Sequence, residues 1–235
     1  MSATFSGQVA LVAGGTGGLG RAVSLAFLQA RATVIVTYRK PDELSALKTA
    51  AGANGDRLDG HEVDVTKEPA VLALVEAVRM RHGRLDALVN AVGAYSGGVP
   101  LWEQDPTTLA RMLDLNLLSG YTLLRAVAPV MLSQGHGAIV NVASTAAFDH
   151  AAGNSAYAAS KAAAVALVDS LAEDLKGTAV RANSILPSII DTEANRKAMP
   201  KADFSKWPKP EDIARVILFL CSDDAKLIRG AAIRV

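Results

Sequence analysis

The sequence predicts an α/β fold, a doubly wound parallel sheet of about seven strands with helices on both faces. Several short runs are almost unbroken stretches of aliphatic residues, as strands covered on both faces require. The segments between these runs are long enough for right-handed helical crossovers. No linker or change of composition divides the chain, so we expect one domain spanning residues 1–235.

The predicted strands recur along the whole chain. They are VALVA (9–13), TVIVT (33–37), GHEVDV (60–65), LDALVNAVG (85–93), GAIVNVAS (137–144), VRANSILP (180–187) and the closing AAIRV (231–235). Two predicted helices, 107–131 and 154–176, are apolar or small around most of their surface. A helix without a polar face is normally buried on both sides, so a partner subunit is the simplest cover. We therefore expect a homo-oligomer.

Composition excludes several kinds of partner. The 24 basic and 23 acidic residues give a formal net charge of +1, so no broad basic field attracts nucleic acid or an anionic membrane. Cys221 is the single cysteine, and the four histidines lack metal-ligand spacing, so we expect neither a disulfide nor a metal. No signal peptide pattern is visible and no apolar run reaches about 18 residues, which predicts a cytoplasmic protein without a membrane helix.

A glycine-rich turn, VAGGTGGLGRAV (12–23), follows the first predicted strand and opens a helix. Its glycines fit both G-x-G-x-x-G and G-x-x-x-G-x-G. Without side chains, backbone N–H groups and the helix N-terminus can approach a pyrophosphate, as in Rossmann-type sheets. The alternative is a glycine-rich turn without a ligand. The candidate cofactor-binding residues here are Gly14, Thr16, Gly18, Leu19 and Gly20.

The end of the second predicted strand indicates which dinucleotide is bound. A site for NAD(H) usually has a carboxylate there, which binds the ribose 2′-hydroxyl. Here Tyr38 takes that position and Arg39 follows, a planar cation that can bind a 2′-phosphate through two hydrogen bonds. The prediction is NADP(H), with NAD(H) less favoured, against the alternative of a solvated basic turn.

Four polar residues in a characteristic order form the candidate catalytic group. Asn116 lies within a predicted helix, Ser144 ends a strand, and Tyr157 and Lys161 lie four residues apart at the start of a helix, on one face. Tyrosine and lysine at this spacing are common as a packed ring and a surface amine. The order and the strand-end positions favour a site.

These motifs together resemble the short-chain dehydrogenase/reductase family, from about Gln8 to the last residues. The family's T-G-x-x-x-G-x-G looks like Ala13–Gly20, its N-N-A-G like Asn90–Gly93, and its P-G-x-V-x-T like Pro187–Thr192. The resemblance implies a catalytic tetrad of Asn116, Ser144, Tyr157 and Lys161 and, commonly, a tetramer or a dimer. It also implies cofactor contacts from Asp64, Val65, Asn90, Ala91, Gly93, Tyr157, Lys161, Pro187, Ile190 and Thr192.

The resemblance also implies roles in hydride transfer between nicotinamide and a small-molecule substrate. Tyr157 exchanges the proton, and a nearby lysine cation and the oxidised nicotinamide are expected to lower its pKa from about 10. Ser144 holds the acceptor atom. Lys161 binds the nicotinamide ribose, and the helix around Asn116 opens for a water that links Lys161 to solvent.

The substrate is less determined. The segment DTEANRKAMPKADFSKW (191–207) resembles the corresponding stretch of dihydropteridine reductases, whereas Ser144 and Arg39 do not fit that pattern. Three hypotheses remain: a ketone or 3-oxoacyl reductase, a pteridine reductase, and a non-catalytic dinucleotide sensor. Tyr95 and Trp102, after the fourth strand, either line the substrate entrance or cap it.

Overall fold

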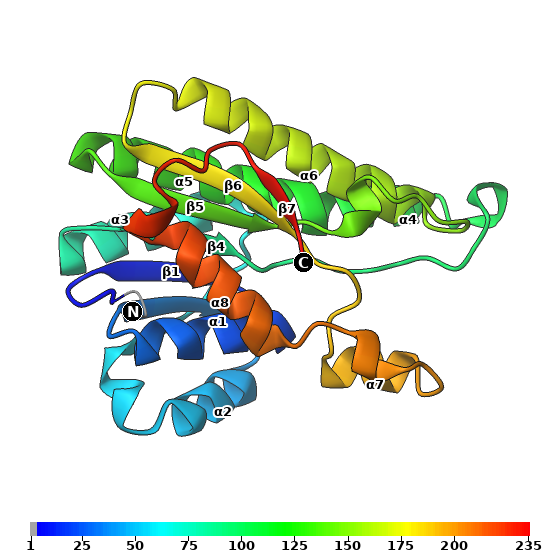
Figure 1. Ribbon diagram of the computed structural model, residues 1–235, viewed down its shortest axis with the longest axis horizontal. Coiled ribbons are helices and arrows are strands. Elements are labelled where there is room, and N and C mark those ends of the chain that lie inside the picture. Colours follow the sequence, from blue (N-terminus) through cyan, green and yellow to red (C-terminus); the bar gives the residue numbers. More distant parts are fainter. Residues whose placement is uncertain (1–3) are drawn as a thin grey trace.

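The computed structural model describes residues 4–235, and its strands form one seven-stranded sheet (Figure 1). The strand order is β3-β2-β1-β4-β5-β6-β7, and every neighbouring pair is parallel. The strands are β1 Val9–Ala13, β2 Thr33–Tyr38, β3 Leu58–Glu62, β4 Ala87–Asn90, β5 Gly137–Val142, β6 Val180–Leu186 and β7 Ala232–Arg234. The doubly wound α/β fold predicted from the sequence is confirmed.

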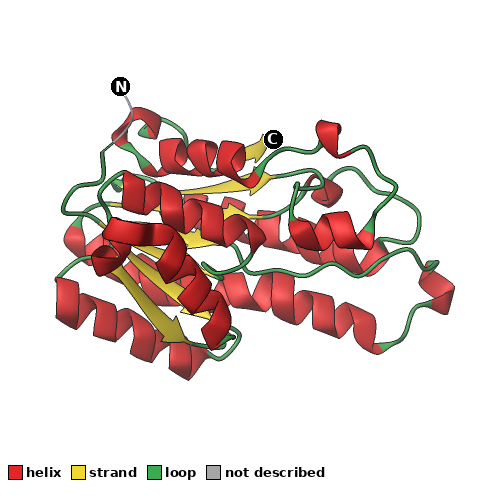
Figure 2. Cartoon of the chain, turned by 90° about the horizontal axis from the view of Figure 1, so that it is seen from below, coloured by secondary structure: helices red, strands yellow, loops and turns green. Residues whose placement is uncertain are grey.

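Two helical layers cover the sheet (Figure 2). The helices are α1 Gly18–Gln29, α2 Pro41–Ala51, α3 Glu68–His82, α4 Thr107–Leu113, α5 Ser119–Gln134, α6 Ser155–Asp174, α7 Glu193–Ala198 and α8 Pro210–Cys221. Apolar residues of α1, α2 and α8 form one core cluster with one face of the sheet, and those of α3, α5 and α6 form a second with the other. Both faces of the central strands are therefore buried, which explains their unbroken apolar sequences.

The predicted third strand was placed too far along the chain. β3 spans Leu58–Glu62, whereas the alternating sequence suggested 60–65. β3 pairs only with β2, and the last registered pair is Tyr38 with Glu62, so the ladder stops where β2 stops. Asp64 and Val65 consequently lie in the loop beyond the strand, at the carboxyl edge of the sheet.

Helices α4 and α5 join into one segment, Thr107–Gln134, through a π-helical turn at Asp114–Leu118. This 28-residue segment is long and apolar enough to cross a membrane, which corrects the expectation that no stretch would reach that length. Much of it is buried, and α5 supplies nine buried residues to the protein interior. Its apolar character therefore serves the core.

The carboxyl ends of the strands carry the long connections. The segment after β4 runs out to α4, and the segment after β6 leads to α7, which lies beyond the end of the sheet in Figure 1. Ligands of open parallel sheets bind at this edge, where the winding reverses between β1 and β4. The fold therefore places the candidate residues at the edge where they are expected.

Candidate active site

The glycine loop has an unusual backbone conformation and leaves room for an anion. Gly14 has φ +70°, which favours glycine, and a Cβ on Gly20 would lie 2.1 Å from the Gly14 carbonyl oxygen. The turn is therefore packed too closely for any side chain at position 20. Gly17 has only one neighbour, at 3.5 Å, so this side of the loop is open. Helix α1 begins with no side-chain cap and no acidic residue in its first turn, which leaves its N–H groups available to an anion.

Two hydroxyl groups that the sequence analysis did not single out hold this loop in place. Thr37 accepts a hydrogen bond from the Gly14 N–H at 2.9 Å. Ser24 donates to the carbonyls of Gly15 and Gly20 at 3.0 and 2.8 Å. The only sequence signal was their placement: Thr37 lies near the end of the second strand, and Ser24 lies in the helix that follows the glycine turn. Thr16, a predicted cofactor contact, donates to Glu43 at 3.0 Å.

The end of β2 presents a basic side chain toward the adjoining loop. Arg39 is exposed, and it has no ion-pair partner within residues 4–235. Its charge helps lower the pKa of Asp64, although hydrogen bonds from Thr66 contribute more. Arg39 and Asp64 are therefore near enough for their charges to interact, at the edge of the sheet where the adenosine part of a dinucleotide is expected. Val65 next to them is buried.

The four candidate catalytic side chains come from three parts of the fold and meet at this edge. Ser144 lies just after β5 and is 8% exposed. Tyr157 and Lys161 lie in the first turns of α6, and the Lys161 ammonium donates to the Val142 carbonyl at 3.1 Å. Asn116 lies in the π-helical turn and is 2% exposed. Their convergence fits the prediction made from their order in the chain.

Asn116 connects the loop after β4 to α6. Its side chain accepts from the Ala94 N–H at 2.9 Å and donates to the Ala94 carbonyl and to Ser160, both at 3.0 Å. Ser160 donates in turn to the Tyr157 carbonyl at 2.7 Å. In the π-helical turn the Ser119 N–H reaches the Asp114 carbonyl, five residues back. The helix is therefore locally widened around Asn116, as expected.

Gly93 brings the β4 loop close to these groups. A Cβ at this position would lie 2.9 Å from Oδ1 of the Asn116 side chain and 3.1 Å from the Lys161 ammonium nitrogen. Preceding it, the Asn90 side chain donates to Asn141 on β5 at 2.8 Å, and the Ala91 N–H donates to the Ala13 carbonyl. Asn90 and Ala91 thus join β4 to its two neighbours, and of these three predicted residues Gly93 alone lies beside the candidate catalytic group.

Burial dominates the electrostatics of the site. It lowers the pKa of Lys161 to about 8 and raises the pKa of Tyr157, which the nearby Ser144 hydroxyl opposes. The Lys161 ammonium lies 6.0 Å from the centre of the Tyr157 ring. The expectation that Lys161 lowers the Tyr157 pKa is wrong for the protein alone, because desolvation is the larger effect. The charge of an oxidised nicotinamide remains as a contributor.

The loop after β6 reaches back over the glycine turn. A Cβ on Gly18 would lie 2.7 Å from the Thr192 methyl carbon, so the two segments touch. The Thr192 hydroxyl caps α7 by accepting from the Asn195 N–H at 3.2 Å, and the Ile190 carbonyl accepts from the Asn195 side chain. Pro187 is anchored through its carbonyl to the Thr145 N–H. These groups lie at the site, although some of their hydrogen-bonding capacity is used locally.

The two aromatic residues after β4, Tyr95 and Trp102, differ in their contacts and their exposure. The Tyr95 ring lies 5.0 Å from the Tyr157 ring at 78°, an edge-to-face contact. Trp102 is 84% exposed, and its indole N–H donates to the neighbouring Glu103. Tyr95 therefore belongs to the site, whereas Trp102 lies on the surface of the same loop.

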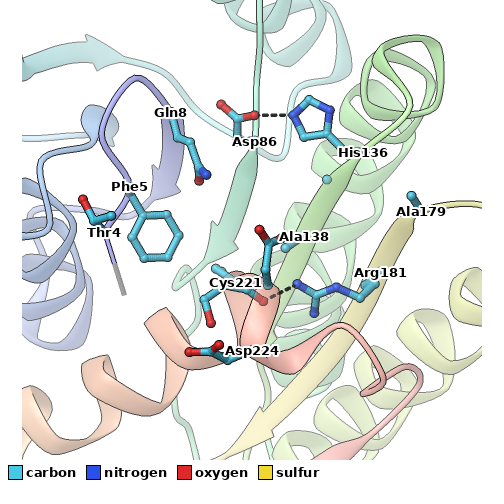
Figure 3. Close-up of a pocket in the computed structure, with 13 residues that line it drawn as sticks. Thr4, Phe5, Gln8, Asp86, His136, Ala138, Ala179, Arg181, Cys221 and Asp224 are labelled. Atoms are coloured by element: carbon cyan, nitrogen blue, oxygen red, sulfur yellow. Dashed lines mark hydrogen bonds and ion pairs between the residues drawn. The ribbon is translucent and has the colours of Figure 1, made fainter. Parts of the chain in front are cut away.

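A cavity at the opposite end of the sheet contains none of these residues (Figure 3). It is lined by residues at the amino ends of β1, β4, β5 and β6, including Asp86, His136 and Arg181. Figure 3 shows Asp86 and His136 pointing toward each other, and the Arg181 guanidinium directed at the end of α8. The two ends of the sheet are thus chemically separate.

A parallel doubly wound sheet with a glycine turn before α1 and Ser, Tyr and Lys side chains at its carboxyl edge defines a dinucleotide-dependent oxidoreductase. The family model described as short chain dehydrogenase matches residues 8–203. The chain belongs to the short-chain dehydrogenase/reductase family. It is an NAD(P)-dependent oxidoreductase that acts on CH–OH or C=O groups.

The relatives have several activities. The 3-oxoacyl-(acyl-carrier-protein) reductase FabG of Thermotoga maritima is 32% identical over 97% of this chain and 96% of its own length. The 7alpha-hydroxysteroid dehydrogenase of Escherichia coli is 30% identical over 97% and 92%. The D-threitol dehydrogenase of Mycolicibacterium smegmatis is 34% identical over 96% and 90%.

Solved structures agree with the fold. A short-chain dehydrogenase/reductase from Mycobacterium ulcerans has a TM-score of 0.93 at 31% identity, covering 99% of this chain and 89% of its own. ElxO with NADP bound has a TM-score of 0.92 at 26% identity, covering 97% and 96%. The resemblance of residues 191–207 to dihydropteridine reductases gains no support from these comparisons.

Proposed function

We propose that this chain is an NADP(H)-dependent reductase of ketones or 3-oxoacyl compounds, with Tyr157 as the general acid and base. The observation that carries the proposal is the convergence of Ser144, Tyr157 and Lys161 at the carboxyl edge, beside the glycine turn. Two relatives, a 3-oxoacyl-(acyl-carrier-protein) reductase and a hydroxysteroid dehydrogenase, support a carbonyl or alcohol substrate.

The residues present fit a dinucleotide. The open side of the glycine turn and the uncapped start of α1 fit a pyrophosphate, and Arg39 fits a 2′-phosphate. When bound, the cofactor supplies the hydride at C4 of its nicotinamide. The preference for NADP(H) rests on Arg39 and on tyrosine at the position usually taken by a carboxylate. It is supported by the NADP-bound structure of ElxO.

The protein residues then have separate tasks. Tyr157 protonates the acceptor atom as it receives hydride, and Ser144 fixes that atom with a second hydrogen bond. Lys161 binds the nicotinamide ribose. The widened helix at Asn116 admits a water that returns a proton to Lys161. The intact tetrad argues against a non-catalytic sensor.

Ser144 favours a carbonyl acceptor over a pterin. Charge develops on one oxygen of a ketone, which two donors stabilise, whereas a pterin spreads charge over its ring nitrogens and needs one donor less. Removing one donor to a developing oxyanion costs about 10² to 10³ in rate. Ser144→Ala is therefore expected to be nearly inactive with a ketone substrate and only mildly slowed with a quinonoid dihydropterin.

The test is oxidation of NADPH and NADH by the purified protein with a panel of diketones, 3-oxoacyl thioesters, quinones and quinonoid dihydropterin. We expect reduction of at least one carbonyl with NADPH, and strong loss of that activity in Ser144→Ala. Reduction of the dihydropterin alone, unaffected by Ser144→Ala, would overturn the carbonyl assignment.

We also propose a homo-oligomer, a tetramer or a dimer, in the cytoplasm. A groove between α5 and α6 is lined largely by apolar residues, among them Tyr121, Leu124, Leu132 and Leu167. Tyr121 and Leu132 are 48% and 44% exposed, and a second copy is the cover we propose for them. Light scattering at micromolar concentration is expected to give a multiple of the 24.4 kDa chain mass, and a monomeric mass would contradict this.

A further inference from the structure

We infer that Tyr95 forms one wall of the acceptor site and selects substrates that carry a flat unsaturated ring next to the reacting carbonyl. This inference rests on the proposed reduction of carbonyl compounds. It adds a class of substrate and names the residue that would recognise it.

Tyr95 is held in one place although most of it is exposed. Its ring meets the Tyr157 ring edge-to-face at 5.0 Å, and its hydroxyl donates to the Asn154 side chain at 2.9 Å. Asn154 immediately precedes α6, the helix that carries Tyr157. Tyr95 is thus fixed to the catalytic residue both directly and through the helix start.

The backbone beneath Tyr95 is shaped for this arrangement. A Cβ on Gly97 would lie 2.1 Å from Oδ1 of the Asn154 side chain and 2.4 Å from the Tyr95 hydroxyl oxygen. The Gly98 N–H donates to the Gly153 carbonyl at 3.0 Å. The loop after β4 is therefore joined to the loop before α6 by a backbone hydrogen bond as well as by the Tyr95 side chain.

The free surface of Tyr95 is available to a substrate. The residue is 63% exposed, so contact with Tyr157 covers only part of it. A large aromatic side chain that is both ordered and exposed offers contact area at little cost in conformational entropy. The acceptor carbonyl must meet the Tyr157 hydroxyl, and the two rings are 5.0 Å apart, so a group attached to that carbonyl reaches Tyr95. An aromatic substituent can stack there.

The experiment compares acetophenone with cyclohexyl methyl ketone, two probes with the same carbon skeleton and different ring flatness. The readout is the ratio of their kcat/KM values with NADPH, which is compared between variants so that intrinsic reactivity cancels. Tyr95→Leu is expected to lower the ratio about 3- to 10-fold, as loss of one aromatic pair predicts. Tyr95→Phe, which keeps the ring, is expected to hold the ratio within about twofold.

Trp102→Leu is the matched control, because it removes a more exposed aromatic from the same loop and is expected to leave the ratio unchanged. An unchanged ratio in Tyr95→Leu, or an equal fall in Trp102→Leu, would overturn the inference. The same two ketones are also titrated calorimetrically into the protein with NADP⁺, where no reduction occurs. If the wild type reduces neither ketone, the proposed function fails for these probes, and the binding ratio alone decides the role of Tyr95.

Discussion

The amino and carboxyl ends of the sheet both bury charged side chains, but they surround them differently. At the amino end, Arg181 is 6% exposed and donates to the carbonyls of Leu220, Ser222 and Ala225. Its guanidinium therefore caps carbonyl groups at the C-terminal end of α8. At the carboxyl end, Lys161 is 5% exposed and its ammonium donates to the Val142 carbonyl alone among residues 4–235.

The Asp86 carboxylate, also at the amino end, likewise has several hydrogen-bond partners. It accepts from the Val9 N–H at 2.8 Å, from Arg84 twice and from His136 at 2.5 Å. Burial alone would raise the pKa of Asp86, but these hydrogen bonds outweigh it and the pKa is lowered. A saturated charge stabilises one arrangement of the chain, whereas an incompletely partnered charge retains capacity for a ligand. The comparison therefore favours a stabilising role for the amino end and supports the proposed chemistry at the carboxyl end.

Among the effects on cofactor binding, the largest is expected at Arg39, the exposed cation of the carboxyl end. Charge-assisted hydrogen bonds contribute about 1.5 to 3 kcal/mol, or roughly ten- to a hundredfold or more in affinity. The double variant Tyr38→Asp, Arg39→Ala is expected to lose this preference for NADPH and to bind NADH more tightly. Dissociation constants of both cofactors check this, with Lys40→Ala as the control. Equal affinity of the wild type for NADH and NADPH would show that Arg39 has no such role.

The second prediction concerns the pH dependence of NADPH binding, which tests the role of Lys161. Because burial lowers its pKa to about 8, the ammonium is present below that pH and is lost as the pH rises through it. We expect NADPH affinity to fall about tenfold between about pH 7 and pH 9, following the protonated fraction of a single group. Lys161→Arg stays charged and should show a flat profile over this range. A flat profile for the wild type would contradict the role of the ammonium.

A smaller effect, on stability alone, is expected from Asp86→Asn. The change removes the charge from a saturated cluster and should lower the free energy of unfolding by about 1 to 3 kcal/mol. Since the folded-state pKa of Asp86 is lowered, its contribution is present at neutral pH and is lost as the pH falls through that pKa. Urea unfolding measures this, with the exposed Glu76→Gln as control.

The kinetic part of the same experiment separates the two ends. Folded Asp86→Asn is expected to keep the wild-type kcat and KM, because the cavity at the amino end contains no proposed catalytic residue. A loss of kcat in the folded variant would contradict the proposal that the amino end serves stability and the carboxyl end serves catalysis.

Much of the fold followed from the sequence because buried parallel strands are continuous apolar runs. β1 was predicted with its observed bounds, and β2, β5 and β6 within two residues at either end. β3 was not, since its end depends on where its partner β2 stops. The π-helical turn at Asn116 was expected only through a resemblance, because local sequence does not distinguish it from an α-helix.

The site was predictable where residue type and order were sufficient. Ser144, Tyr157 and Lys161 stood out because their spacing and strand-end position identify them. Tyr95 was named only together with Trp102 and with two alternatives, because its contact with Tyr157 depends on how the loop after β4 packs against α6 across 62 residues of sequence. The direction of the Tyr157 pKa also depended on burial, which the sequence does not quantify.

Turnover of Tyr157→Phe tests the central claim most directly. The variant keeps the ring and its contact with Tyr95 and removes the proton donor. With saturating NADPH and the best carbonyl substrate of the wild type, kcat is expected to fall about 10²- to 10⁴-fold while NADPH affinity stays within about threefold. Full activity of the folded variant on that substrate would contradict the account.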